Sequence, residues 1–210
     1  MSFVTALKRP FSDVKKLALG AIVTLVPILN IGLQGYALRC ATKKGNDLPE
    51  WNGFGSIWVQ GLLALVISLI WSIPLMIVVG LTLGSVVFSL LKNPSGITSL
   101  IGTASGGFLI SFLLGVLTAY LVPVALLQFA NGSFSDAFAL SRVFKKAFTS
   151  VWLVGWILAI VATVILGVIG MLLSAILAIT IIGPIIVQLL VAFAGSVAGW
   201  SLLGEAYSAK

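Results

Sequence analysis

The sequence contains no histidine, and Cys40 is its single cysteine. Without histidine, zinc and haem sites lack a common ligand, and acid–base catalysis lacks its usual base. One cysteine can form neither an intramolecular disulfide nor a thiolate metal cluster. No group of side chains suggests a nucleophile with an adjacent base. We therefore expect a protein that is not an enzyme and that holds no metal or other cofactor.

Charge is also scarce and is confined to a few clusters. Charged residues make up 8% of the chain, against roughly a quarter in an ordinary soluble domain, whereas 60% of the residues are hydrophobic. Three runs carry no charge at all, namely residues 51–91, 93–135 and 147–204, of 41, 43 and 58 residues. About 20 residues suffice to cross a hydrocarbon core ~30 Å thick. The composition therefore predicts an all-α integral membrane protein.

The length of each run decides how many helices it can hold. The first run is too short for two spans and a turn, so one long helix is expected there. The last run can hold two helices, because Gly183 and Pro184 offer a connection with proline in the first turn of the second helix. The sequence predicts a single domain, residues 1–210, with four transmembrane helices packed as a bundle: near 56–81, 98–129, 150–178 and 184–207.

A further hydrophobic segment precedes these spans. Lys16 and Arg39 enclose 22 uncharged residues, about the length of one crossing. The middle of this segment holds Pro27, which interrupts a helix, and the polar Asn30 and Gln34, which need surroundings covered by protein. The segment either crosses the membrane, which makes five transmembrane helices, or breaks and re-enters through the same face.

The distribution of lysine and arginine bears on this choice, because both prefer the cytoplasmic side. A crossing segment leaves 5 basic residues inside and 7 outside, whereas a re-entrant segment leaves 11 inside and only Lys92 outside. We therefore favour a re-entrant or proline-broken segment, with both termini cytoplasmic and the protein in the cell membrane. A proline-kinked ordinary span, giving five helices, is the alternative.

The stretch "KKGNDLPEWNGFGSIW", residues 43–58, joins this segment to the first span. Asp47 and Glu50 have the spacing of a capping box, which predicts a short helix lying on the membrane. Aromatic side chains in such a position settle at the depth of the lipid headgroups. The expected interfacial anchors are Pro49, Trp51, Phe54 and Trp58.

A second interfacial helix is predicted in "NGSFSDAFALSRVFKKAFTS", residues 131–150. Ser133 and Asp136 can cap it, and its apolar and basic residues recur at the spacing of an amphipathic surface helix. Each basic residue near an anionic leaflet contributes about 1 kcal/mol. The net charge of +7 points to no nucleic acid, because the basic residues flank apolar spans. The candidates for binding anionic lipid, which can also serve only as topology anchors, are Arg142, Lys145 and Lys146.

Small and polar residues inside the predicted spans indicate how the helices pack. Three pairs of glycines, each four residues apart, let helices approach closely, within one bundle or between subunits. They are Gly80 and Gly84, Gly102 and Gly106, and Gly195 and Gly199. Polar residues are expected to bond across helices or to line a cavity, with Glu205 pairing to a cytoplasmic base such as Arg39. These polar residues are Asn30, Gln34, Gln128, Gln188, Arg39 and Glu205.

Three stretches resemble a known family. "TLVPILNIGLQGYALR", "DLPEWNGFGSIWVQGLLALVISLIWSIP" and "LLGEAY" are similar, in this order, to a family of prokaryotic multi-pass membrane proteins known as domain of unknown function 4013. The similarity runs from about Lys8 to Tyr207, and the "LPEW" block is its most specific part. Because the family has no assigned activity, the resemblance implies an archaeal or bacterial membrane protein and transfers no catalytic residue.

Two functions fit these features. A non-enzymatic scaffold or accessory subunit, packing with partner helices and anionic lipid, is favoured by the small-residue faces, the basic cytoplasmic surface and the lack of charge within the spans. A permease or channel subunit for an uncharged or lipid-like solute is the alternative, favoured by the broken first segment and the amides. The expected partners are membrane lipids and either a second copy of the chain or another membrane protein.

Overall fold

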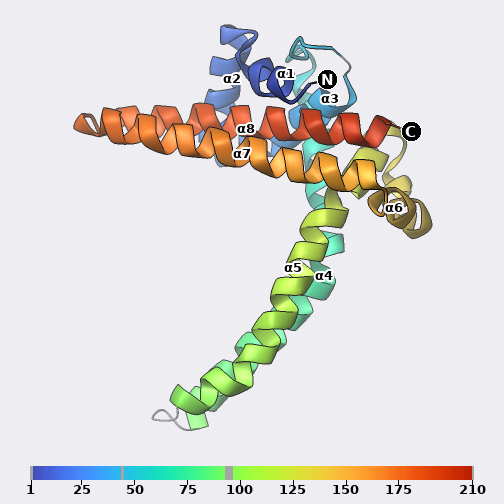
Figure 1. Cartoon of the computed structure of the whole chain (residues 1–210), viewed down its shortest axis with the longest axis vertical. Helices are drawn as coiled ribbons and strands as arrows, with labels where there is room; N and C mark the ends of the chain where they lie inside the picture. The colour runs from blue at the N-terminus through green and yellow to red at the C-terminus, as the bar shows by residue number, and fades with distance from the viewer. Residues whose placement is uncertain (1, 44, 93–96, 210) are drawn as a thin grey trace.

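The computed structural model describes residues 2–43, 45–92 and 97–209, with side chains described for all of these except residues 97–104. In this part of the chain every regular element is helical (Figure 1). The prediction of an all-α protein is confirmed. The α-helices are α1 (Phe3–Lys8), α2 (Val14–Leu25), α3 (Pro27–Thr42), α4 (Phe54–Lys92), α5 (Ile97–Asn131), α6 (Leu140–Ala147), α7 (Ser150–Ile176) and α8 (Ile182–Ser208). The short 3₁₀ helices are η1 (Arg9–Phe11), η2 (Phe134–Phe138) and η3 (Leu177–Ile179).

Four of these helices, α4, α5, α7 and α8, are long and apolar enough to cross a membrane. At about 1.5 Å per residue, the 27 residues of α8 extend about 40 Å, which exceeds the ~30 Å of a hydrocarbon core. Within the described residues, the number of helices of spanning length agrees with the four that the sequence predicts. The first charge-free run forms one helix, as expected, and this helix continues past Pro74 to Lys92. The connection between α7 and α8 lies just before Gly183.

The four long helices form two pairs rather than one bundle. α4 packs along α5 and α7 packs along α8, and Figure 1 shows the two pairs diverging from a common corner. The burial of α4 reflects this divergence, because Ile57, Ala64 and Ile67 all lie in its first half. Beyond Ile67, Thr82 is the one buried residue among those described in α4. The expectation of a single bundle is therefore wrong.

The hydrophobic segment before α4 folds as a helical hairpin. α2 and α3 are separated by Val26, whose backbone is extended (φ −97°, ψ 115°), and Pro27 occupies the first turn of α3. The 12 residues of α2 and the 16 of α3 extend about 18 and about 24 Å, so each is shorter than a hydrocarbon core. Lys16, near the start of α2, donates to Glu50 Oε1 in the loop after α3 at 2.6 Å. Both ends of the segment therefore lie on the same side of the molecule.

Helix α3 lies against α4 and α8 with almost no space between the main chains. A Cβ atom at Gly35 of α3 would lie 1.9 Å from the carbonyl oxygen of Ile57 in α4. One at Gly61 of α4 would lie 1.9 Å from the carbonyl oxygen of Ile31 in α3. Further along α3, a Cβ atom at Gly204 of α8 would lie 2.0 Å from the carbonyl oxygen of Ala41. Only glycine fits at these three contacts, because the obstacle is main chain in each case.

The short helix predicted in residues 43–58 is absent, which corrects that expectation. Residues 45–53 form an irregular loop, and α4 begins directly after Gly53, whose φ of +69° favours glycine. Glu50 contacts Lys16 of α2 rather than capping a helix. The spacing of a capping box does not produce a helix here, because the carboxylate has a charged partner elsewhere in the fold.

The predicted interfacial anchors lie in or just after this loop and contact α3. Trp51 stacks on Tyr36 of α3 with 3.9 Å between ring centroids, and the Tyr36 hydroxyl donates to the carbonyl oxygen of Pro49 at 2.9 Å. Phe54 lies beside Trp51, with ring centroids 6.5 Å apart. Trp58 Nε1 donates to a main-chain oxygen in the first turn of α3 at 2.8 Å. These contacts hold the loop and the start of α4 against α3.

Candidate functional site

The three basic candidates for lipid binding lie on the short helix α6. Val143 and Ala147 are fully buried against the rest of the protein, whereas Arg142 and Lys145 are exposed. Lys146 is half-buried. α6 therefore buries Val143 and Ala147 against the protein and leaves its basic side chains at or near the surface.

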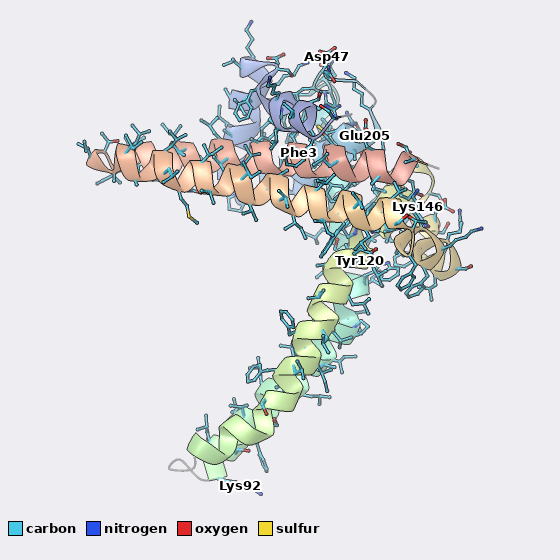
Figure 2. All side chains as sticks on the ribbon, viewed as in Figure 1. Phe3, Asp47, Lys92, Tyr120, Lys146 and Glu205 are labelled. Carbon is cyan, nitrogen blue, oxygen red and sulfur yellow. The ribbon has the colours of Figure 1, made fainter. Side chains whose placement is uncertain are left out.

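A cavity of about 440 Å³ lies between α6 and the ends of α5 and α8. We call it the basic cavity. Figure 2 shows Lys146 and Glu205 at this corner of the molecule, whereas Lys92 lies at the far tip of the α4–α5 pair. The structure brings all three basic candidates into the wall of this cavity, together with side chains from three other elements. The polar residues of the wall include Gln128, Asn131, Asp136, Arg142, Lys145, Lys146 and Tyr207.

Asp136, the acidic residue in the wall of the basic cavity, is already engaged. Its carboxylate accepts hydrogen bonds from the hydroxyl and the main-chain N–H of Ser133, at 2.6 and 2.7 Å, and from the Arg142 guanidinium. The hydrogen bonds from Ser133, together with that from Arg142, lower the pKa of Asp136 to about 2. Asp136 is therefore ionised at neutral pH, and its charge offsets that of Arg142.

Lys145 and Lys146 add positive charge that is not offset in this way. Neither forms an ion pair with another residue of the described chain. Lys146 Nζ donates to the carbonyl oxygen of Ala209 at 2.7 Å and lies 5.7 Å from the centre of the Tyr207 ring. Partial burial lowers the pKa of Lys146. The basic cavity therefore carries an excess of positive charge.

Gln128, at the end of α5, also lines the basic cavity. It is 6% exposed, and its Oε1 atom is buried without a hydrogen-bond partner in the structure. Of the two expectations for Gln128, a cross-helix hydrogen bond or a place in a cavity wall, the structure shows the second. By contrast, Gln188 of α8 donates to the Ser174 hydroxyl of α7 at 3.2 Å.

A second cavity, of about 410 Å³, adjoins the first, because Asn131 and Tyr207 line both. Its wall includes Arg9 and Glu205. The two cavities together form a polar region where the ends of α3, α5, α6 and α8 come close to one another. Sequence reasoning placed Glu205 near a cytoplasmic base, and it identified neither Arg9 nor Tyr207 as part of a site.

Arg9 is 2% exposed and connects several elements at this corner. Its Nη1 atom donates to the Cys40 carbonyl oxygen and the Ser201 hydroxyl, each at 2.8 Å. Its Nη2 atom donates to the carbonyl oxygens of Lys43 at 3.0 Å and Asp47 at 3.3 Å. These bonds join the end of α3, the following loop and α8. No sequence signal reveals this role, because Arg9 stands beside another basic residue in a stretch without periodicity.

The remaining polar candidates lie outside the two cavities. Asn30 and Gln34 are exposed on α3. Arg39 donates to the Asn52 carbonyl oxygen at 3.2 Å and to the Ser56 hydroxyl at 2.8 Å. Arg39 therefore secures the start of α4 and not the polar corner.

The predicted packing glycines divide into two groups. Gly195 and Gly199 of α8 face α7, where a Cβ atom would lie 3.6 and 3.4 Å from Thr163. Gly102 lies outside the residues whose side chains are described. The second group faces open space, because a Cβ atom there would meet nothing within 4 Å: Gly80, Gly84 and Gly106.

Four apolar helices of spanning length define this chain as a multi-pass helical membrane protein. The chain belongs to the family of proteins of unknown function DUF4013, whose profile matches residues 18–179. This match confirms the resemblance seen in the sequence. Comparisons with curated proteins and with solved structures give no match. Within the described residues, no group of three or more histidine, cysteine, aspartate or glutamate side chains could hold a metal ion.

Proposed function

We propose that this protein is a non-enzymatic scaffold or accessory subunit of the cell membrane, which packs with partner helices and binds anionic lipid. The basic cavity carries the proposal. It has three cationic side chains and one carboxylate in its wall, and it lies at the ends of two apolar helices, the level at which lipid headgroups are found. Basic side chains at that level attract anionic headgroups.

The outer halves of α4 and α5 support the packing with partner helices. Gly80 and Gly84 of α4 and Gly106 of α5 have open space where a Cβ atom would lie. Such positions let a second helix approach closely in a membrane. The partner is a second copy of this chain or another membrane protein.

The N-terminal hairpin supports a re-entrant topology with both termini in the cytoplasm. Both ends of the hairpin lie on one side of the molecule, and Figure 1 shows the two chain termini near the same corner. The tip of the α4–α5 pair, with Lys92, lies far from that corner (Figure 2). This topology places the basic cavity on the cytoplasmic side, where lysine and arginine are preferred.

A permease or channel subunit for an uncharged or lipid-like solute is the second candidate. A groove of about 380 Å³ along α7 and α8 favours it, because apolar and small side chains line the groove, among them Trp156, Gly195 and Gly199. Crosslinking and co-purification from native membranes separate the two candidates. A stoichiometric protein partner supports the scaffold, and a lone oligomer that encloses a solvated path supports the permease.

Replacing Arg142, Lys145 and Lys146 together by glutamine should weaken the retention of anionic lipid. Only the two lysines are counted, because the charge of Asp136 already offsets that of Arg142. At about 1 kcal/mol each they contribute about 2 kcal/mol of binding free energy, or roughly thirtyfold in affinity. Native mass spectrometry of the detergent-solubilised protein measures the retained lipid. A matched control replaces Lys8, Lys15 and Lys92, which are exposed away from the basic cavity, and should retain lipid as the wild type does. Equal retention in both triple variants would contradict the lipid-binding proposal.

The topology can be tested with an impermeant thiol reagent in a Cys40→Ser background. Single variants Lys8→Cys, Lys43→Cys and Lys145→Cys should react only after the membrane is opened, whereas Lys92→Cys should react in intact cells. The expectation follows from the hairpin, whose two ends lie on one side. If Lys43→Cys and Lys145→Cys react from outside while Lys8→Cys stays protected, the first segment is a true crossing and the protein has five spans.

A further inference from the structure

The amide of Gln128 has no evident structural purpose at its position. The side chain is 6% exposed, and its Oε1 atom is buried without a partner. A buried polar atom without a hydrogen bond destabilises the fold, and leucine would fill the same volume without that cost. Because Gln128 lines the basic cavity, a molecule bound in that cavity gives a reason for an amide there.

The groups around the cavity indicate what such a molecule must offer. With its carbonyl oxygen enclosed, the Gln128 amide has its NH₂ group to donate. Lys145 and Lys146 present ammonium groups, and Tyr207 adds a hydroxyl. The carboxylate of the wall, Asp136, is engaged by Ser133 and Arg142. A ligand that suits this set is negatively charged and rich in hydrogen-bond acceptors.

The placement of these donors favours a tetrahedral anion over a planar one. They come from three helices, with Gln128 on α5, Lys145 and Lys146 on α6 and Tyr207 on α8. A phosphate group presents acceptor oxygens in several directions and forms strong hydrogen bonds with cationic donors. A carboxylate has two oxygens in one plane and meets fewer of these donors at once.

We propose that the basic cavity binds one phosphate group, held by the ammonium groups of Lys145 and Lys146 and by the amide of Gln128. The inference rests on the proposed function and deepens it. It names the bound group as a phosphate, and it adds Gln128, a residue that attraction between opposite charges alone would not require. The phosphate belongs either to a phospholipid headgroup or to a free phosphate ion.

The test compares Gln128→Leu with Gln188→Leu in the full-length protein purified in an uncharged detergent. The probes are phosphatidylglycerol, diacylglycerol as the analogue without phosphate, and inorganic phosphate. Gln128→Leu should bind phosphatidylglycerol about tenfold more weakly, as expected for one hydrogen bond to a charged group. Its melting temperature should be unchanged or higher, because an unpaired buried atom has been removed. Gln188→Leu changes an amide outside the cavity and should bind phosphatidylglycerol as the wild type does.

The arms of the experiment separate the sources of the phosphate. If inorganic phosphate competes with phosphatidylglycerol, and competes less well in Gln128→Leu, the site binds the free phosphate ion as well as the lipid. Binding of phosphatidylglycerol that inorganic phosphate does not displace assigns the site to the headgroup. If Gln128→Leu binds as tightly as the wild type while Lys145→Gln with Lys146→Gln binds weakly, the phosphate site is overturned and the proposed function stands. If diacylglycerol binds as well as phosphatidylglycerol, both proposals fail.

Discussion

Replacing Gly61 by alanine is expected to destabilise the protein by about 3 kcal/mol or more, at the upper end of the usual cost of overpacking. The added Cβ atom would lie 1.9 Å from the carbonyl oxygen of Ile31. Main chain cannot rotate away as a side chain can, so α3 and α4 must separate to relieve the clash. Gly35→Ala should behave alike, because its Cβ atom would lie 1.9 Å from the Ile57 carbonyl oxygen. Thermal melting in detergent, followed by size-exclusion chromatography, measures the effect.

Gly55→Ala is the matched control for this prediction. It changes the same residue type in the same helix, but its Cβ atom would meet nothing within 4 Å. Alanine favours helix over glycine by up to about 1 kcal/mol, so this variant should melt at the wild-type temperature or slightly above it. A Gly61→Ala protein that melts like the Gly55→Ala protein would show that α3 does not dock against α4 as described.

Replacing Arg9 by glutamine is expected to cost on the order of 3 kcal/mol of stability, as hydrogen bonds from a charged donor contribute about 1.5–3 kcal/mol each and do not add fully. The guanidinium donates four hydrogen bonds at distances from 2.8 to 3.3 Å. A shorter side chain leaves main-chain oxygens at the end of α3 and in the following loop without their donor. Thermal melting measures the loss, and limited proteolysis within residues 45–53 reports on release of the loop.

Two further variants complete this experiment. Lys8→Gln removes the adjacent charge, which is exposed, and should leave melting and proteolysis unchanged. Arg9→Lys keeps the charge with fewer donors and should fall between the wild type and Arg9→Gln. If Arg9→Gln melts at the wild-type temperature, the buried guanidinium does not hold α3, the loop and α8 together.

The loop at residues 45–53 shows why local spacing misled the sequence analysis. Asp47 and Glu50 satisfy the rule for a capping box, yet Glu50 pairs with Lys16, which lies far away in the sequence. Trp51 stacks on Tyr36 of α3 rather than starting a surface helix. A propensity rule considers only neighbouring residues, and here contacts with distant residues outweigh it.

The candidate site was visible in part. Arg142, Lys145 and Lys146 recur at helical spacing, and Gln128 stands out as an amide in an apolar span, so the sequence identifies both. It does not show that Gln128 and α6 share a cavity, nor that Tyr207 from the end of α8 lines it too. Those residues are brought together by the fold, and no periodicity connects them.

By itself the sequence determined the class of the protein, the four helices of spanning length, the break at Pro27 and the position of the basic residues. Each of these depends on the spacing of nearby residues or on the length of an apolar run, and that length can be compared directly with the thickness of a bilayer. Only the tertiary structure decided that the two helix pairs diverge, that Gly35 and Gly61 bring α3 against α4, and that Arg9 is buried. The physical reason is that side chains facing lipid and side chains facing protein are equally apolar in a membrane. Hydrophobic pattern therefore does not reveal which helix faces meet, and the shapes of distant segments decide it.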